Sequence, residues 1–205
     1  PADYAEKNME ELHNRAAILS ELGLKGSIIG ASPQFLPEAI YEEHPSWRGP
    51  RCDMPFRSRR PYFAPCVDNE EVLELYRDAS KHIGEAAPVI DTAIFLCVDS
   101  GTGLCWYDGL YPGANGPQAC AHRTMEERVS GFTEALACGL KVNNTNPLVF
   151  LTNIPTWTFF GHLRPHPGVR SSEKVFFART PQDKPVIYEN PLAMLASLET
   201  AVDGQ

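Results

Sequence analysis

The sequence lacks several features that would place it in a common class of protein. It contains no run of about 18 apolar residues, so no segment is predicted to span a membrane. Positive charge is also scarce, because 18 Lys and Arg residues face 26 Asp and Glu residues, which gives a net charge of −8. No basic stripe is present to neutralise phosphates, so nucleic acid is not an expected partner. The N-terminal residues form a polar helical pattern and not a signal peptide, which leaves the compartment open.

Motifs for nucleotides and for zinc are missing as well. There is no GxxxxGK[ST] segment and no GxGxxG after a strand, which disfavours nucleotide-dependent enzymes. Cys105, Cys120 and His122 carry ligand-type side chains, as do His162 and His166, but none has the tight Cys-x2-Cys spacing of zinc sites. The sequence therefore predicts no metal and no cofactor. A metal-dependent hydrolase that uses such Cys and His groups is retained as an alternative.

The six cysteines do not decide the redox compartment. Two of them are expected in the core: Cys97 in an apolar strand and Cys138 on the buried face of a helix. The other four bracket two loops, Cys52 with Cys66 and Cys105 with Cys120. Each pair is compatible with a disulfide in a secreted protein and with free thiols in a cytosolic one, and both interpretations stay open.

What is present is an ordinary globular composition, with 43% apolar and 21% charged residues in 205. Periodicity and caps predict helices at residues 3–22, after Asp68, after Thr124 with its capping-box partner Glu127, and after Asn190. Apolar runs predict buried strands at residues 24–30, at residues 94–98 and at residues 147–152. Long loops are predicted at residues 31–67 and 153–180.

This alternation predicts an α/β fold of parallel β/α units, because each strand is followed by a crossover helix. Every long loop follows a strand, which is typical of a (β/α)8 TIM barrel that binds its ligand at the carboxyl ends of the strands. A full barrel has eight strands, and only three are evident here. Residues 1–205 are therefore predicted to be a single domain or an excised section of a (β/α)8 catalytic domain, roughly strands three to five. The remainder of the barrel would then be a partner.

Asp99 is the predicted catalytic residue. It follows the apolar run at the carboxyl end of a predicted strand, where such folds place their chemistry. Neighbouring aromatic residues would raise its pKa, as a general acid requires. The alternative is that Asp99 only hydrogen-bonds the backbone of its own turn. Glu38 is considered as its carboxylate partner.

Substrate contacts are predicted in the loops around this acid. Flat aromatic rings beside a carboxylate are a common way to hold sugars, and a loop rich in Gly and Pro has a shaped backbone. The planar guanidinium of arginine can bind a ligand carboxylate through two hydrogen bonds. Arginines in a loop also pair with nearby acids of the protein itself, such as Asp53 and Asp68. The predicted substrate-binding residues are Trp106, Tyr107, Tyr111, Asn115, Asn153, Trp157, Arg51 and Asp53.

Three segments carry a family resemblance: YFAPCVDNEEVLELYRDA (62–79), FLCVDSGTGLCWYDGLYPGANGP (95–117) and ERVSGFTEALACGLK (127–141). They resemble the middle of TIM-barrel glycoside hydrolases of the β-hexosaminidase-like and α-glucuronidase-like superfamily. The three segments lie between residues 62 and 141. It implies an acid after the fourth strand that protonates the glycosidic oxygen, which maps onto Asp99. This chain has Asp99-Ser100 where hexosaminidases have an Asp-Glu pair, and α-glucuronidases have a glutamate there.

The sequence thus predicts a carbohydrate-active hydrolase with a carbohydrate substrate, in which Asp99 is the general acid or a substrate-binding carboxylate. The competing class is a non-catalytic α/β module that binds a glycan or a protein through the same aromatic loops. The sugar, the linkage and the stereochemical outcome are not predicted.

Overall fold

The fold of the chain is seen in a computed structural model, which describes residues 2–53, 58–97, 101–107, 110–141, 148–152, 176–179 and 185–188. Asp99, Asn153, Trp157 and the helix expected after Asn190 lie outside these residues. In chain order the elements are α1 (Ala2–Glu21), β1 (Gly26–Ala31), α2 (Glu38–Glu43), η1 (Pro45–Trp47), β2 (Arg48–Arg51), β3 (Phe63–Pro65), α3 (Glu70–Ala86), β4 (Ile90–Leu96), η2 (Gln118–Cys120), α4 (Met125–Leu140), β5 (Leu148–Thr152), β6 (Phe176–Arg179) and β7 (Pro185–Tyr188).

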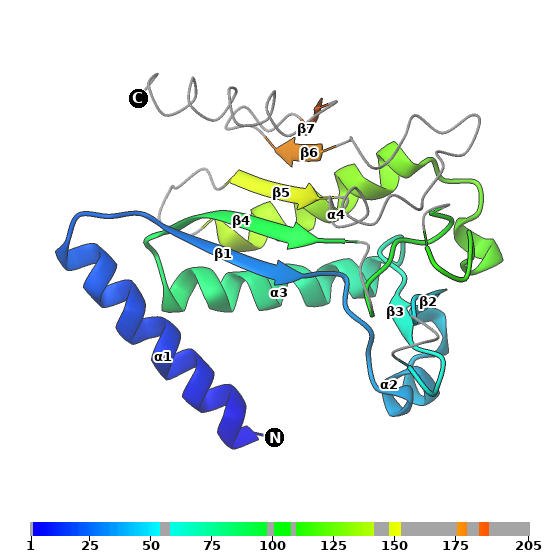
Figure 1. The fold of residues 1–205 in the computed structure, drawn as a ribbon, viewed down its shortest axis with the longest axis horizontal. Coiled ribbons are helices and arrows are strands. Elements are labelled where there is room, and N and C mark those ends of the chain that lie inside the picture. Colours follow the sequence, from blue (N-terminus) through cyan, green and yellow to red (C-terminus); the bar gives the residue numbers. More distant parts are fainter. Residues whose placement is uncertain are drawn as a thin grey trace.

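A central sheet with the order β1-β4-β5-β6-β7 runs through the molecule (Figure 1). Strand β4 pairs in parallel with β1 on one side and with β5 on the other. The predicted α/β class and the three predicted strands are therefore confirmed. Strands β6 and β7 pair antiparallel, which departs from the predicted all-parallel units, and β6 lies inside the segment 153–180 that was expected to be a loop. Both strands have four residues, too few for a periodic pattern to reveal them.

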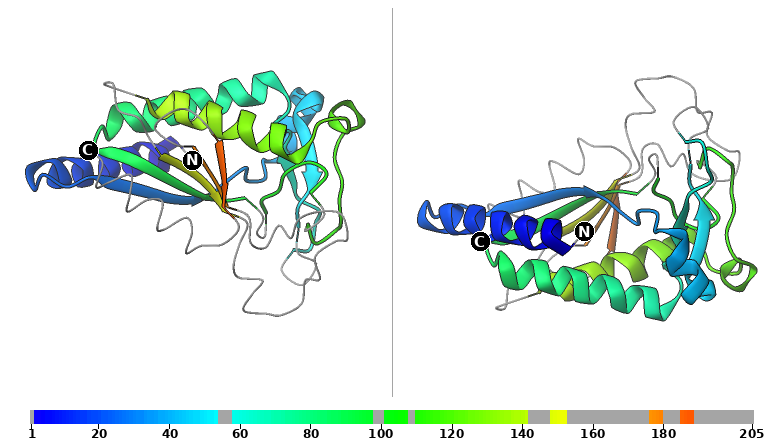
Figure 2. Two further views of the ribbon diagram at one scale, coloured as in Figure 1. Left: turned by 90° about the horizontal axis from the view of Figure 1, so that it is seen from above. Right: turned by 90° about the horizontal axis from the view of Figure 1, so that it is seen from below.

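Helices α3 and α4 lie side by side on one face of this sheet (Figure 2). Tyr76 of α3 meets Phe132 of α4 edge to face, with ring centroids 4.9 Å apart. The two helices approach closely at Gly139, where an added Cβ would lie 2.3 Å from the carbonyl oxygen of Arg77. The main core is formed here, between the inner faces of both helices and buried strand residues such as Ala93 and Val149.

Helix α1 packs near the amino ends of β1 and β4. Ala16 is buried against Ile90 and Ala87, and Leu12 packs beside them. The ring Nδ1 of His13 lies 3.1 Å from the carbonyl oxygen of Ala86. No helix in the described part of the chain combines the length and the apolar character needed to cross a membrane.

The segment predicted as one long loop, residues 31–67, contains regular structure. It holds α2, η1 and the two-stranded antiparallel sheet of β2 and β3, so the loop prediction was wrong there. Long-range contacts hold these short elements: the Tyr41 hydroxyl donates to the carbonyl oxygen of Phe63 at 2.6 Å, and the Arg48 guanidinium lies 4.8 Å from the ring centroids of both Tyr41 and Phe63. Periodicity cannot reveal elements of three to six residues that depend on such contacts.

The N-terminal ends of α4 and α3 can be compared with the N-cap residues predicted from the sequence. The capping box of α4 is confirmed, because Thr124 and Glu127 exchange backbone and side-chain hydrogen bonds. The predicted cap of α3 was wrong by one residue: the Asn69 side chain accepts from the backbone N–H groups of Glu71 and Val72. Asp68 instead forms ion pairs with Arg128 and Arg123.

Candidate functional site

The segments that follow β1 and β4 meet the β2–β3 sheet beyond the carboxyl ends of the parallel strands (Figure 1). We call residues 32–53, 58–68, 101–107 and 110–123 the carboxyl-end platform. Phe35 N–H donates to the carbonyl oxygen of Gly101 at 2.7 Å, and Gly101 N–H donates to the carbonyl oxygen of Cys52 at 2.9 Å. An isolated bridge between Gln34 and Thr102 adds to this pairing. The backbone just after Asp99 in the chain is therefore fixed against two other segments.

Gly101 is required at this junction. Its φ of +86° lies in the left-handed region, which L side chains rarely adopt. A Cβ at this position would also lie 2.8 Å from Cδ1 of Phe35, whose ring stacks on Tyr62. The glycine thus allows the turn after β4 to lie directly on the aromatic pair.

Asn115 ties two parts of the platform together. Its side-chain oxygen accepts from the backbone N–H of Arg51, and its amide nitrogen donates to the carbonyl oxygens of Arg51 at 3.2 Å and Gly113 at 2.7 Å. Asn115 was predicted to contact a sugar. In the structure its amide forms hydrogen bonds with the backbone, and these hold the loop of residues 110–117 on β2.

Arg51 and Asp53 form an ion pair with each other. Arg51 Nε and Nη2 donate to the two carboxylate oxygens of Asp53 at 2.6 and 3.0 Å, and Tyr62 N–H donates at 3.4 Å. The hydrogen bonds from Arg51 hold the pKa of Asp53 below its usual value. The alternative stated for these arginines, that they pair with nearby acids, is confirmed for Arg51. Glu38 is likewise engaged, in an ion pair with Arg48.

The three described aromatic residues of the Gly- and Pro-rich loop differ in exposure. Trp106 has a φ of 62°, its N–H donates to the carbonyl oxygen of Asn115 at 2.7 Å, and its ring Nε1 donates to that of Pro117 at 3.3 Å. Tyr107 is buried, whereas the side chain of Tyr111 is half exposed. Among these three, Tyr111 presents the most surface to a ligand. Their predicted companions Asp99, Asn153 and Trp157 lie outside the described residues.

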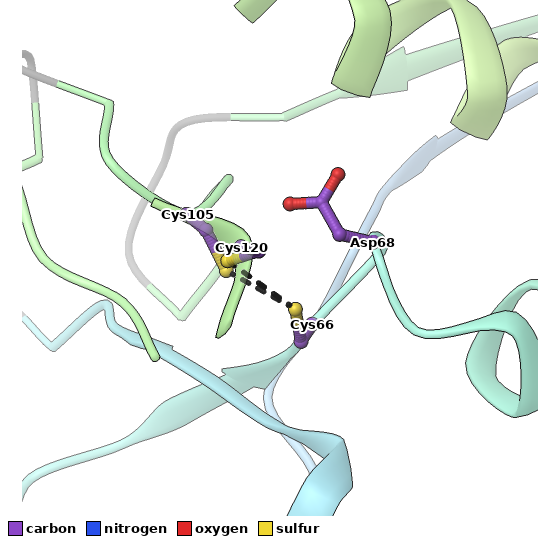
Figure 3. A group of neighbouring side chains, drawn as sticks. All are labelled: Cys66, Asp68, Cys105 and Cys120. Atoms are coloured by element: carbon purple, nitrogen blue, oxygen red, sulfur yellow. Dashed lines mark hydrogen bonds between the residues drawn. The ribbon is translucent and has the colours of Figure 1, made fainter. Parts of the chain in front are cut away.

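The platform also gathers three cysteine side chains from distant parts of the chain. Cys66 follows β3, Cys105 follows β4 and Cys120 ends η2, and all three are buried (Figure 3). Cys66 Sγ lies 3.6 Å from Cys105 Sγ and 3.8 Å from Cys120 Sγ. All six cysteines of the chain are free thiols.

Asp68 completes this group, which we call the Cys–Asp cluster (Cys66, Asp68, Cys105 and Cys120). One donor atom from each of the four residues lies within 4.8 Å of all the others. Asp68 Oδ2 accepts from Nε of the buried Arg128 at 2.6 Å, and Arg128 Nη2 donates to the carbonyl oxygen of Cys120 at 2.9 Å. Asp68 Oδ1 is buried and receives no hydrogen bond from the described residues, although Arg123 Nε lies 3.5 Å away.

One thiol of the cluster, that of Cys66, differs in its pKa from the other buried thiols. A hydrogen bond from the Cys105 thiol lowers the pKa of Cys66, and the same bond raises the pKa of Cys105 because it holds the proton there. Burial raises the pKa of Cys120 to about 11. At Cys52, outside the cluster, burial raises the pKa to about 12. The Cys–Asp cluster therefore favours one thiolate, at Cys66.

Only half of this cluster was predicted from the sequence. Cys105 and Cys120 were considered as ligand types, but His122 is not in the cluster and Cys66 and Asp68 were missed. Of the two interpretations left open for the pairs Cys52–Cys66 and Cys105–Cys120, the structure shows free thiols and no disulfide. Cys66 faces Cys105 and Cys120, while the Cys52 thiol donates to the carbonyl oxygen of Tyr62 at 3.6 Å. Cys138, expected in the core, is exposed. Cys66 and Asp68 lie close together in the chain, but no local spacing connects them with Cys105 and Cys120.

No family model and no curated protein matches this chain.

Proposed function

We propose that the chain is a section of a (β/α) barrel from a carbohydrate-active hydrolase, with its substrate site on the carboxyl-end platform. The observation that carries this proposal is the order of the parallel strands. β1, β4 and β5 are neighbours in the order in which they occur in the chain, and the intervening helices α3 and α4 lie on the same face of the sheet (Figure 2). Doubly wound sheets instead reverse their strand order and carry helices on both faces.

The opposite face of the sheet supports the same proposal. Ile28 packs against the core, and Ile29, the next residue of β1, points to the other face and is 68% exposed. In a barrel this second face is the interior, covered by the remaining strands. Strands β6 and β7 do not follow the barrel pattern because they run antiparallel, so the proposal concerns β1, β4, β5 and their crossovers.

Asp99 is the proposed general acid, by the resemblance and by its place after β4. Its carboxylic acid would give its proton to the glycosidic oxygen as the bond from that oxygen to the anomeric carbon breaks. Water would then add to the anomeric carbon, which requires a second carboxylate as base or nucleophile. Glu38 and Asp53 are both held in ion pairs, with Arg48 and Arg51, and we assign that role to neither.

The proposed sugar contacts divide into two groups. Tyr111 is half exposed and would stack on a sugar ring, and Asn153 and Trp157 are proposed contacts from the part of the chain that follows β5. The remaining predicted contacts act by holding the platform in shape, since their polar groups bond within it or their rings are buried there: Trp106, Tyr107, Asn115, Arg51 and Asp53.

The test is hydrolysis of a panel of oligosaccharides and aryl glycosides by the full-length protein in water enriched in ¹⁸O. We expect release of a reducing sugar that carries ¹⁸O at its anomeric carbon, because water attacks there. Tyr111→Ala should raise KM more than it lowers kcat, with Tyr4→Ala as control, since Tyr4 is also exposed but lies on α1. Binding of a glycan without cleavage would contradict the proposal and favour the non-catalytic module. Failure to bind or cleave any member would contradict both.

A further inference from the structure

We propose that the Cys–Asp cluster is a structural zinc site, in which Cys66, Cys105 and Cys120 supply three thiolates and Asp68 supplies one carboxylate oxygen. The donors come from three segments: the residues after β3, the loop after β4 and the end of η2. The ion would fasten these segments to one another beneath the surface of the platform. This inference is independent of the proposed hydrolase activity.

The distances between the sulfur atoms fit this ion. Tetrahedral zinc with Zn–S bonds of about 2.3 Å places neighbouring sulfur atoms about 3.8 Å apart. Cys66 Sγ lies 3.6 Å from Cys105 Sγ and 3.8 Å from Cys120 Sγ. Figure 3 shows the sulfur atoms of Cys105 and Cys120 facing that of Cys66, with the Asp68 side chain beside them. Soft thiolates select zinc over magnesium or calcium, which prefer oxygen ligands.

Asp68 has the bonding pattern of a zinc ligand. One carboxylate oxygen, Oδ2, accepts from Arg128, while Oδ1 is buried, lies 3.5 Å from Nε of Arg123, and receives no hydrogen bond from the described residues. A buried carboxylate oxygen that lacks a hydrogen bond costs free energy, which binding to a metal ion would offset. Metal-bound carboxylates are commonly held by such a hydrogen bond on the second oxygen. We therefore assign Oδ1 to the metal.

The charges of the surroundings also balance. Three thiolates and one carboxylate carry four negative charges, a zinc ion carries two positive charges, and Arg123 and Arg128, which both pair with Asp68, carry two more. Burial of a charged group is costly unless it is compensated.

We assign a structural and not a catalytic role to the zinc, because its four positions are all filled by protein ligands. Cys66, Cys105 and Cys120 are at most 4% exposed, and four protein donors complete a tetrahedron and leave no position for water or substrate. Cys105 directly precedes Trp106, and Cys120 precedes α4 by a few residues. Zinc would therefore fix the loop that carries Tyr111 relative to β3 and α4.

The first test is zinc analysis of the full-length protein, purified without chelators and under reducing conditions. We expect stoichiometric zinc by elemental analysis and by native mass spectrometry. Cobalt(II) substitution should give an intense thiolate-to-cobalt charge-transfer band together with tetrahedral ligand-field bands. A folded, reduced protein that binds neither ion with these signatures overturns the proposal, as does a native disulfide between two of the three cysteines.

Single substitutions locate the site. Cys105→Ser and Asp68→Asn should each weaken zinc binding by at least about 100-fold, since loss of an outer-shell partner alone commonly costs 10- to 100-fold. Cys52→Ser is the matched control, because Cys52 is equally buried but lies outside the cluster, and its zinc affinity should be unchanged. Equal affinity in Cys105→Ser and Cys52→Ser overturns the assignment.

A variant that exchanges one ligand tests the role of Asp68 by its cobalt spectrum. Asp68→Cys should retain zinc and give a stronger thiolate-to-cobalt band than the wild type, because a fourth sulfur replaces the oxygen. An unchanged band in this variant would show that Asp68 is not a ligand. Asp99→Asn should keep its full zinc content whatever its activity, so failure of the zinc site and failure of the hydrolase proposal are distinguishable.

Discussion

Arg128 of α4 donates to Asp68 at 2.6 Å across the interior, and the side chains are 1% and 2% exposed. The same guanidinium donates to the carbonyl oxygen of Cys120 at 2.9 Å. One side chain thus joins α4 to two of the segments that form the platform. The position of the Cys–Asp cluster relative to the main core depends on this contact.

Removal of the arginine should be costly. Arg128→Met is expected to lower the free energy of unfolding by about 3–5 kcal/mol, because it removes the buried partner of a buried carboxylate and leaves only the partly exposed Arg123 beside it. Arg15→Met is the control: Arg15 pairs with Glu11 on the exposed surface of α1, and such pairs contribute about 0.3–0.5 kcal/mol. Urea unfolding of both variants measures the difference. Equal stability of the two variants would show that the buried pair contributes little.

Alanine substitutions at two glycines with similar backbone angles distinguish the stability cost of steric overlap from the cost of backbone strain. Gly101 and Gly113 have φ values of +86° and +84°, but an added Cβ meets Phe35 at 2.8 Å only at Gly101, and at Gly113 nothing lies within 4 Å. Gly113→Ala should cost about 1–2 kcal/mol, from the left-handed conformation alone. Gly101→Ala should cost distinctly more, and thermal unfolding of both variants tests this. A smaller loss at Gly101 would contradict the close packing of the turn after β4 on Phe35.

The Arg51–Asp53 pair should make stability depend on pH. The pKa of Asp53 is lowered in the folded state, so its contribution is present above the unfolded value of about 3.9 and is lost as the pH falls through the folded value. Asp53→Asn should therefore be less stable than the wild type at pH 7, and the difference should shrink as the solution becomes strongly acidic. Urea titrations from neutral to acidic pH measure it. A difference that stays constant across this range would show that ionisation of Asp53 is unimportant.

Local signals in the sequence predicted a large part of the fold. Thr124 and Glu127 indicated the start of α4, and apolar runs revealed the three parallel strands, because these features depend on residues close together in the chain. The strands β2 and β3 were missed, since each is short and is held by its partner. Asp68 shows the limit most clearly: it has the local pattern of a cap, but a residue of α4 60 positions later determines its role.

The candidate site was less predictable than the fold. Cys66 and Cys105 are 39 positions apart, and Cys66 and Cys120 are 54 apart, so no local spacing motif marks them as a group. Asn115 and Arg51 looked like ligand-binding side chains, because polar residues in loops carry the same signal whether they bind a ligand or brace a backbone. Only the fold decides between these roles.

Turnover by Asp99→Asn is the measurement that tests the proposed hydrolase most directly. The full-length wild type and this variant should be compared on a cleaved substrate, with Asp91→Asn as control, because Asp91 lies at the amino end of β4, away from the platform. We predict that kcat falls by about 10²- to 10⁴-fold in Asp99→Asn with substrate affinity retained, as expected for loss of a general acid. The control should turn over at the wild-type rate. Unchanged turnover by Asp99→Asn would contradict the catalytic role of this residue.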